Sequence, residues 1–555
     1  MTNPRPVRRR IKIVVIDTDS RRTGLGAIIG LLTAAVAIGV AQLVAGLVGA
    51  NSSPVVAVQE VSVNFTPPAL KNFAITAFGA NDKLVLLCGV LVVLALFAAL
   101  IGMEAMRRLD FGLAGLVVFA LIGIVAAITR PHASAAAVLP TLIGVGAGAG
   151  ALVLLLRAAQ PQGAQPVAAP APSARPAGAK LAPREHGSGT ADSPPALAGS
   201  ERRRFLVTGV AVAGTAAVTG FGGRVLSERT NVTQAQKSLR IPPPTVQAPP
   251  LPAGTDLKIP GLSPFITPNG AFYRVDTAIV LPEVAPASWQ LRVHGMVSRE
   301  INLTFDQLIR RPLTEDYITL TCVSNPVAGP YIGNARWLGA SLASLLREAG
   351  VRAGADQLLC TSADGFTSGA PLLTAIDGRD AMLAVAMNGS VLPVEHGFPV
   401  RMVIPGLYGY VSACKWITDI EVTTFAANSA YWAQRGWDQQ APIKTESRID
   451  VPTGQNPIRA GRTSVAGVAW AQHRGIEAVE VRVDRGQWQQ ARLAAVPDID
   501  TWRQWAWDWD AAPGNHLIEA RATDKTGYTQ TAMQAPPEPN GATGYPSVQV
   551  SVTSG

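Results

Sequence analysis

The sequence predicts a multi-domain protein in which N-terminal transmembrane helices precede a mixed α/β domain and an all-β, immunoglobulin-like sandwich. Three observations support this fold class. Long uncharged apolar runs fill the first part of the chain, short β-branched strands surround one amphipathic helix in the middle, and apolar and polar residues alternate near the end. A chain of 555 residues is also too long for a single hydrophobic core.

The region 1–157 contains four apolar runs that are each long enough to cross a bilayer as a helix. They occupy about 24–50, 84–102, 111–129 and 136–156. The formal net charge is +9, but the basic residues gather at the flanks of these runs, as in RPVRRRIK. Membrane orientation therefore explains the charge better than nucleic-acid binding does, and it places both ends of this region in the cytoplasm.

Small residues spaced four apart permit close packing between such helices. The pairs with this spacing are Gly26/Gly30, Gly144/Gly148 and Gly146/Gly150.

Residues 158–200 are rich in Pro, Ala and Gly and predict a disordered cytoplasmic linker. Residues 201–226 then begin with Arg202 and Arg203 ahead of an apolar segment, which resembles a twin-arginine export signal. A fifth transmembrane helix is the other interpretation. Both interpretations place the rest of the chain outside the cytoplasm, and without a clear A-x-A cleavage site we expect the segment to remain as an anchor. Residues 227–262 include PPPTVQAPPLPAG, which predicts a semi-rigid second linker.

Residues 263–440 predict the mixed α/β domain. They contain the strand patterns ITLTC, LLCTSA, VRMVIP and ITDIEVTTF, and one amphipathic helix, SLASLLREAG, which ends at Gly350. We expect residues 441–555 to form the sandwich, because Val479, Val481 and Val483 alternate with polar residues, as in a strand with one buried face. In this sandwich we expect Trp502, Trp505, Trp507 and Trp509 to pack in the core.

Cys322 is the last residue of ITLTC and is the first candidate for a metal ligand. A thiolate suits a soft metal, but one Cys with no CxxC and no paired His cannot build a four-ligand zinc site. Any metal there must arrive with most of its ligands already supplied. Downstream, Arg401 has the guanidinium geometry for a phosphate, Lys415 adds a second cation, and the backbone N–H groups of 412–414 are further candidate donors.

Three pieces, ITLTCVSNPVAGPYIGNARWLGASL, SADG and EHGFPVRMVIPGLYGYVSACKW, together resemble the molybdenum-cofactor domain of the sulfite oxidase family, in a membrane-anchored bacterial form. The resemblance runs from about Ile266 to the C-terminus. It implies that Cys322 binds molybdenum, that Cys322 and Arg274 are catalytic, and that the last domain forms a homodimer. The residues it implies for binding the molybdopterin cofactor are Phe272, Tyr273, Arg274, Cys322, Asp364, His396, Arg401, Ser412, Ala413, Cys414 and Lys415.

The substrate side departs from the family pattern. Asp276 and Thr277 stand where the family has an Asn-His pair, and Trp437 stands where it has the tyrosine of the sulfite site. Arg503 is a second candidate for substrate binding and could supply positive charge. Because Trp437 is bulkier than a tyrosine and Asp276 adds a negative charge that would repel sulfite, we expect a substrate that is larger or less anionic than sulfite.

The resemblance implies an exported oxidoreductase, anchored in the cell membrane by several spans, that performs two-electron oxygen-atom transfer on a small substrate. A reductase of S-oxides or N-oxides, including methionine sulfoxide, and a non-catalytic membrane-tethered binding module remain the alternatives. Because the sequence has no CxxCH and no His pair within the spans, we expect electrons to leave through a separate carrier. A disulfide between Cys360 and Cys414 is left open.

Overall fold

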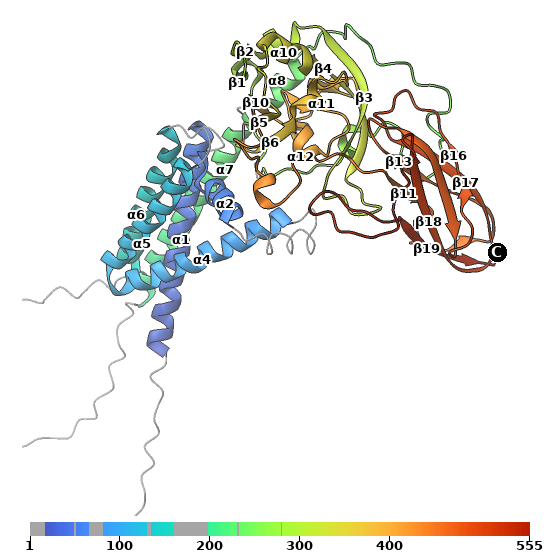
Figure 1. Cartoon of the computed structure of the whole chain (residues 1–555). Coiled ribbons are helices and arrows are strands. Elements are labelled where there is room, and N and C mark those ends of the chain that lie inside the picture. Colours follow the sequence, from blue (N-terminus) through green and yellow to red (C-terminus); the bar gives the residue numbers. More distant parts are fainter. Residues whose placement is uncertain are drawn as a thin grey trace, which may run out of the picture. The chain divides into compact units, whose positions relative to one another are not determined.

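The computed structural model describes residues 17–48, 52–65, 82–129, 135–159, 198–229, 232–278 and 280–554. The chain divides into two compact units, Met1–Thr230 and Asn231–Gly555, whose elements are labelled in Figure 1.

The first unit consists of apolar helices. They are α1 (Asp17–Val48), α2 (Pro54–Phe65), α4 (Asp82–Arg107), α5 (Leu109–Ile128), η3 (Ala135–Val138), α6 (Leu139–Ala159) and α7 (Ala198–Arg229). Five segments among the described residues are long and apolar enough to cross a membrane: Thr23–Val48, Val85–Arg107, Leu109–Ile128, Ala136–Ala159 and Arg203–Gly223. The four predicted spans and the candidate fifth helix fall on these segments. The predicted linker at 158–200 lies almost entirely outside the described residues.

Glycines allow close contacts between α1 and its neighbours α4 and α6. A Cβ added at Gly144 of α6 would lie 2.5 Å from the Ala37 carbonyl oxygen, and one added at Gly26 would lie 2.8 Å from the Cα of Met103 in α4. At Gly146, no atom of the described chain lies within 4 Å of such a Cβ. The prediction of close packing is therefore confirmed for the pairs that include Gly26 and Gly144. It is wrong for Gly146/Gly150, which lie on a face of α6 that contacts no other helix in the described residues.

The second unit begins with a domain of two sheets. Its helices are α8 (Val232–Ser238), η4 (Asn269–Ala271), η5 (Pro286–Ser288), α9 (Phe305–Ile309), α10 (Leu342–Ala349), α11 (Leu372–Ile376), η6 (Val394–His396), α12 (Gly409–Ser412) and η7 (Ala433–Arg435). Its strands are β1 (Gln290–Gly295), β2 (Ile301–Thr304), β3 (Leu313–Thr321), β4 (Ile332–Ser341), β5 (Gln357–Ser362), β6 (Thr367–Pro371), β7 (Met382–Met387), β8 (Ser390–Val391), β9 (Arg401–Val403) and β10 (Ile417–Thr423).

One sheet has the order β2-β1-β10-β5-β6, and the other has the order β3-β4-β7-β8 with β9 paired to β7. The β3 and β4 strands pair along their length, from Leu313↔Ala340 to Thr321↔Ile332. The connection between them, 322–331, therefore begins with Cys322 at the end of a fully paired strand.

The predicted amphipathic helix is α10. Ser341 caps it by accepting a hydrogen bond from the Ser344 N–H at 3.2 Å, and Gly350 ends it with a φ of 69°. A left-handed residue after the last turn favours glycine, because glycine has no Cβ to clash. The mixed α/β character expected of this domain is confirmed.

The last domain has two sheets, with the orders β11-β13-β17-β16 and β12-β19-β18-β14-β15. The strands are β11 (Glu446–Val451), β12 (Ile458–Arg459), β13 (Gly461–Trp470), β14 (Ile476–Val483), β15 (Gln489–Gln490), β16 (Arg492–Leu493), β17 (Arg503–Ala511), β18 (Gly514–Asp524) and β19 (Ser547–Thr553). Residues of both sheets share one core that includes Val479, Val481, Trp505 and Trp509. The domain is thus a two-layer β structure. Trp505 and Trp509 pack in its core as expected and Trp507 packs against that core, but the prediction is wrong for Trp502, which packs in the core shared with the preceding domain and donates through Nε1 to the Phe265 carbonyl oxygen.

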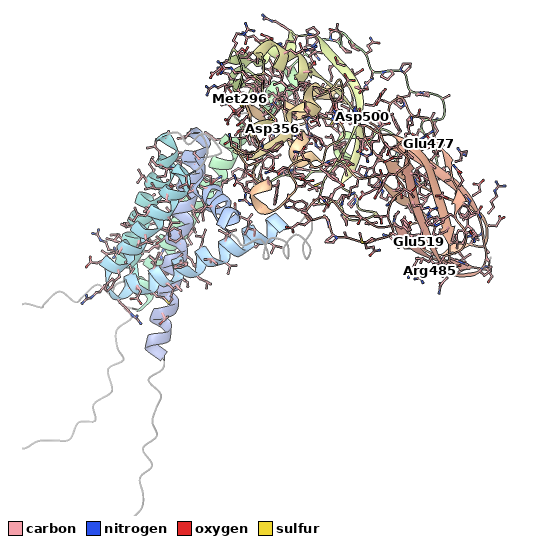
Figure 2. All side chains as sticks on the ribbon, viewed as in Figure 1. Met296, Asp356, Glu477, Arg485, Asp500 and Glu519 are labelled. Carbon is pink, nitrogen blue, oxygen red and sulfur yellow. The ribbon has the colours of Figure 1, made fainter. Side chains whose placement is uncertain are left out.

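The two domains of this unit meet along β3. The Thr319 N–H donates to the Asp500 carbonyl oxygen at 3.0 Å, and Gln472 Nε2 donates to Thr321 Oγ1 at 3.0 Å. Asp500 lies on the loop before β17, as labelled in Figure 2. Hydrogen bonds from the β domain therefore help to fix the position of β3, the strand that leads directly to Cys322.

The Pro-rich segment is not a free spacer along its whole length. The Thr245 N–H donates to the Leu313 carbonyl oxygen at 2.8 Å, and the Glu315 N–H donates to the Val246 carbonyl oxygen at 2.8 Å. Because β3 is an edge strand, its outward backbone groups need partners, and this segment supplies them. The predicted linker at 227–262 is in part a component of the folded unit.

Candidate active site

Cys322 opens the loop after β3 and is partly exposed. Its Sγ lies 2.9 Å from Ser324 Oγ, and its N–H donates to the Tyr331 carbonyl oxygen at 3.0 Å. Burial raises the pKa of the thiol, whereas the Ser324 hydrogen bonds and the positive charge of Lys415 oppose that rise. Loss of the proton thus leaves a thiolate that faces both a donor and a cation.

Arg401 is the most buried cation of the site, at 5% exposure. Its Nη1 donates to the His396 carbonyl oxygen at 3.0 Å, and its guanidinium carbon lies 4.9 Å from the ring centroid of Trp337. Within the described chain it makes no ion pair, and its Nε has no hydrogen-bond partner. Burial lowers the pKa of Arg401 to about 10, so it stays charged at neutral pH without a carboxylate to neutralise it.

Phe272 and Tyr273 line the same region. Their rings stack at 5.3 Å, and Phe272 meets the edge of His396 at 5.5 Å. Burial raises the pKa of the Tyr273 hydroxyl, the nearby Cys322 adds to the rise, and Arg401 opposes it. Tyr273 therefore lies near both the candidate metal ligand and the buried cation.

His396 has its Nε2 at 3.0 Å from the Asn269 carbonyl oxygen. Burial lowers its pKa to about 4, so the imidazole is neutral at pH 7. Since the carbonyl oxygen only accepts, Nε2 carries the ring proton and Nδ1 is left as an acceptor.

Lys415 and Arg274 share one carboxylate. Asp276 Oδ2 lies 2.8 Å from Lys415 Nζ and 2.7 Å from Arg274 Nε. The Asp276 side chain is 4% exposed, and burial lowers the pKa of Lys415 to about 8. Because both cations neutralise it, Asp276 does not present a free negative charge to a substrate, and the expectation that it repels sulfite lacks support in this geometry.

The loop at 412–415 departs from the expected pattern of donors. The Ser412 N–H donates to the Tyr408 carbonyl oxygen at 3.2 Å, and the Ala413 N–H donates to the Gly409 carbonyl oxygen at 3.1 Å. The N–H groups of Ser412 and Ala413 thus already donate to carbonyl oxygens within and just before α12. The prediction that they bind a phosphate is therefore not supported. For the Cys414 N–H group it stays a prediction.

Asp364 forms a turn. Its Oδ1 accepts from the Phe366 N–H at 3.2 Å, and Gly365 follows with a φ of 82°. The Asp364 carboxylate also contributes to the raised pKa of Cys414. Asp364 thus lies close to the cofactor loop as well as in a turn.

The two candidate substrate residues lie elsewhere. Trp437 packs against Tyr410 at 6.0 Å and Trp432 at 6.1 Å. The Arg503 side chain donates to the carbonyl oxygens of Ala494 at 2.7 Å and Ile476 at 2.9 Å, inside the β domain. The described structure gives neither residue a contact with Cys322, and their role stays a prediction.

Cys360 and Cys414 are both buried and free. Cys360 Sγ lies 3.6 Å from Met402 Sδ, and burial raises the pKa of Cys414 to about 12.

Sequence reasoning missed Ser324, Trp337 and Asn269. Ser324 lies two residues after Cys322, which is a spacing that could have identified it. Trp337 approaches the site from β4 and lies within the first of the three motif pieces, whereas Asn269 approaches from η4, where no local motif marks it.

The chain is similar to a molybdopterin-binding family and to several sulfite oxidases. The family described as "Oxidoreductase molybdopterin binding domain" matches residues 278–432. The chain is 32% identical to the sulfite oxidase of Gallus gallus over 324 residues, which cover 49% of this chain and 69% of that protein. It is 31% identical over 288 residues to the mitochondrial sulfite oxidase of Mus musculus, covering 44% of this chain and about half (52%) of that protein.

A nitrate reductase (NADH) of Solanum lycopersicum is 30% identical over 330 residues, covering 48% of this chain and 36% of that protein. Among solved structures, the sulfane dehydrogenase SoxCD of Paracoccus pantotrophus has 27% identity and a TM-score of 0.44, covering 48% of this chain and 75% of that one. Fold and site thus define a molybdopterin-dependent oxidoreductase. The chain belongs to the sulfite oxidase family, and its cofactor is molybdopterin.

The buried groups fit this cofactor. A buried guanidinium with an unpartnered Nε needs an anion, and the cofactor's phosphate is one. The described residues contain no group of three or more His, Cys, Asp or Glu able to hold a metal.

Proposed function

We propose that this protein is a membrane-anchored, exported enzyme that transfers an oxygen atom to or from a small substrate in a two-electron reaction. Cys322 would bind the metal, and Arg401, with His396 and Tyr273 around it, would bind the cofactor. The observation that carries this proposal is the charged, 5% exposed Arg401, which lacks a carboxylate partner in the described residues and lies near Tyr273 and, through it, Cys322.

When bound, molybdopterin supplies the redox chemistry and the oxygen-atom transfer. The chain supplies position and charge. His396 keeps Nδ1 as an acceptor, while the Lys415–Asp276 pair adds little net charge. Arg274, whose side chain is 39% exposed, is the cation that a substrate arriving from solvent would meet first.

The direction of the reaction is the second question. The matching nitrate reductase supports a reductive alternative, in which an S-oxide or N-oxide gives up its oxygen. With the argument from Asp276 removed, the proposal of a larger or less anionic substrate than sulfite rests on Trp437 alone.

Five apolar helices support the membrane anchor, and the Arg-rich flanks support an extracytoplasmic catalytic unit. A separate electron carrier and a homodimer through the β domain complete the proposal.

Steady-state assays of the full chain in detergent test the function. Sulfite would be oxidised with an artificial acceptor, and neutral S-oxides and N-oxides would be reduced with an artificial donor. We expect turnover of at least one of them, and a sulfite kcat/KM well below the ~10⁶–10⁸ M⁻¹s⁻¹ of efficient enzymes. A value within that range would instead identify sulfite as the substrate, and no turnover by metal-loaded protein would favour the binding module.

A further inference from the structure

A buried carboxyl group, Glu446, has no role in the site as described above. It is the first residue of β11 and is 5% exposed. Within the described structure its Oε1 has no hydrogen-bond partner. Because side chains alternate along a strand, Glu446 shares a face with Arg448, whose Nη1 donates to the Gly329 carbonyl oxygen at 3.1 Å. Gly329 belongs to the loop that Cys322 opens, so Glu446 faces that loop.

The Tyr408 hydroxyl lies near both Glu446 and Cys322. Burial raises its pKa, and the nearby Glu446 and Cys322 add to the rise. Tyr408 is 1% exposed, and its hydroxyl accepts a hydrogen bond from the Lys444 N–H at 3.4 Å. A hydroxyl can accept one hydrogen bond while it donates another, so Tyr408 is a candidate to pass a proton between the two groups whose charges act on it.

Other buried polar atoms lie on the same path. Trp470 pairs with Glu446 in the sheet register, and Gln472 donates through Nε2 to Thr321 Oγ1 at 3.0 Å, next to Cys322. In the described residues, neither Trp470 Nε1 nor Gln472 Oε1 has a partner. Ordered water ordinarily satisfies such atoms, so Gln472, which bonds to Thr321, and Trp470, which pairs with Glu446, are each able to bind a water.

We infer that Glu446 is a proton-relay residue, which acts through Tyr408 and ordered water to carry protons between the Cys322 site and the solvent side of the domain interface. The inference rests on the proposed oxygen-atom transfer. Oxidation of a substrate X follows X + H₂O → XO + 2H⁺ + 2e⁻. Two equivalents of a one-electron carrier, such as a ferric haem protein, take the electrons, and the two protons must pass from the site to solvent.

The charge around Glu446 suits this role. Burial raises its pKa to about 8, and Lys444 opposes the rise. The titratable and charged groups that face it are Lys444 and the Tyr408 hydroxyl. Lys444 is partly exposed, and its Nζ donates to Asn540 Oδ1 at 2.9 Å, which marks the solvent end of the route. A carboxyl that titrates near neutral pH can both take up and release protons.

The test compares Glu446→Gln, which keeps the size but cannot ionise, with Glu446→Asp, which restores a carboxyl group. The full chain in detergent would be assayed with ferricyanide as acceptor and the substrate that turns over. Glu480→Gln, at a partly exposed ion pair with Arg521 in the β domain, is the matched control. Infrared titration between about pH 6 and about pH 10 follows the protonated carboxyl band without requiring turnover.

We expect Glu446→Gln to lose the high-pH carboxyl band and to lower kcat on the order of 100-fold with KM and metal content unchanged. The ionisation near pH 8 should vanish from its kcat profile, and Glu446→Asp should recover most of the rate. Unchanged kcat and pH profile in Glu446→Gln would overturn the inference, as would equal losses in the Gln and Asp variants. If wild-type protein lacks turnover altogether, the proposed function fails, whereas the infrared titration still decides whether Glu446 titrates near pH 8.

Discussion

Arg401 carries a positive charge at a position that is 5% exposed, where a charge without a partner is costly. The motif HGFPVR was sufficient to single out the residue, because guanidinium chemistry is local, and its phosphate ligand stays a prediction. The pairing of Asp276 with both Lys415 and Arg274 could not be predicted, since it joins segments far apart in the chain.

We expect Arg401→Met to lose the cofactor and yet to leave the cofactor-free protein as stable as the wild type or more so. Replacement of a buried charge by an apolar side chain of similar length is often neutral or stabilising. Pterin content and thermal unfolding measure the two effects. Arg292→Met, at an exposed ion pair, is the control and should keep its cofactor. Full pterin content in Arg401→Met would contradict the assignment.

The lowered pKa of His396 predicts that the free energy of unfolding depends on pH. Its folded pKa is about 4, against an ordinary value of 6.5. Between these values the unfolded chain binds a proton that the folded chain does not, so stability falls as pH falls through this window, by up to about 1.4 kcal/mol per pH unit. Unfolding of cofactor-free protein should show this slope, and His396→Gln should remove it while His294→Gln does not. An equal slope in His396→Gln would rule out this origin.

At the level of elements, short-range patterns were reliable. The cap at Ser341, the stop at Gly350 and the β-branched strands all carry local signals, and their predictions are confirmed. Two features depend on tertiary contacts, which the periodicity of the sequence does not encode. One is the pairing of residues 245–246 with β3, and the other is that Gly146 has no neighbouring helix within the described residues.

Gly144 and Gly146 give a matched test within α6. We expect Gly144→Ala to destabilise the helical unit, because its Cβ would meet the Ala37 carbonyl oxygen at 2.5 Å. Gly146→Ala has open space in the described structure and should be neutral or slightly stabilising, since Ala favours helix by about 1 kcal/mol. Thermal unfolding in detergent compares them, and equal effects would contradict this packing.

At the level of the whole molecule, the sequence predicted two kinds of structure, apolar helices and folded β-rich domains, and the family of the second. It could not predict that the β domain would hold β3 beside Cys322, because Thr319 and Asp500 are distant in the chain.

The proposed topology places 158–200 in the cytoplasm and 230–555 outside. A reporter fused after Gly555 should therefore be active only in its exported form. Replacement of Arg202 and Arg203 by Lys should block export if the twin-arginine route is used, whereas unimpaired export would favour an ordinary fifth helix.

Metal and pterin analysis of the purified full chain tests the central claim, that Cys322 holds a molybdopterin-bound metal. Wild-type protein and Cys360→Ser should contain molybdenum and pterin in equal amounts. Cys322→Ser should fold and yet lose activity and most of its metal, because a hydroxyl is a poor ligand for a soft metal. Wild-type protein without molybdenum, or Cys322→Ser with full metal content and full activity, would contradict the account.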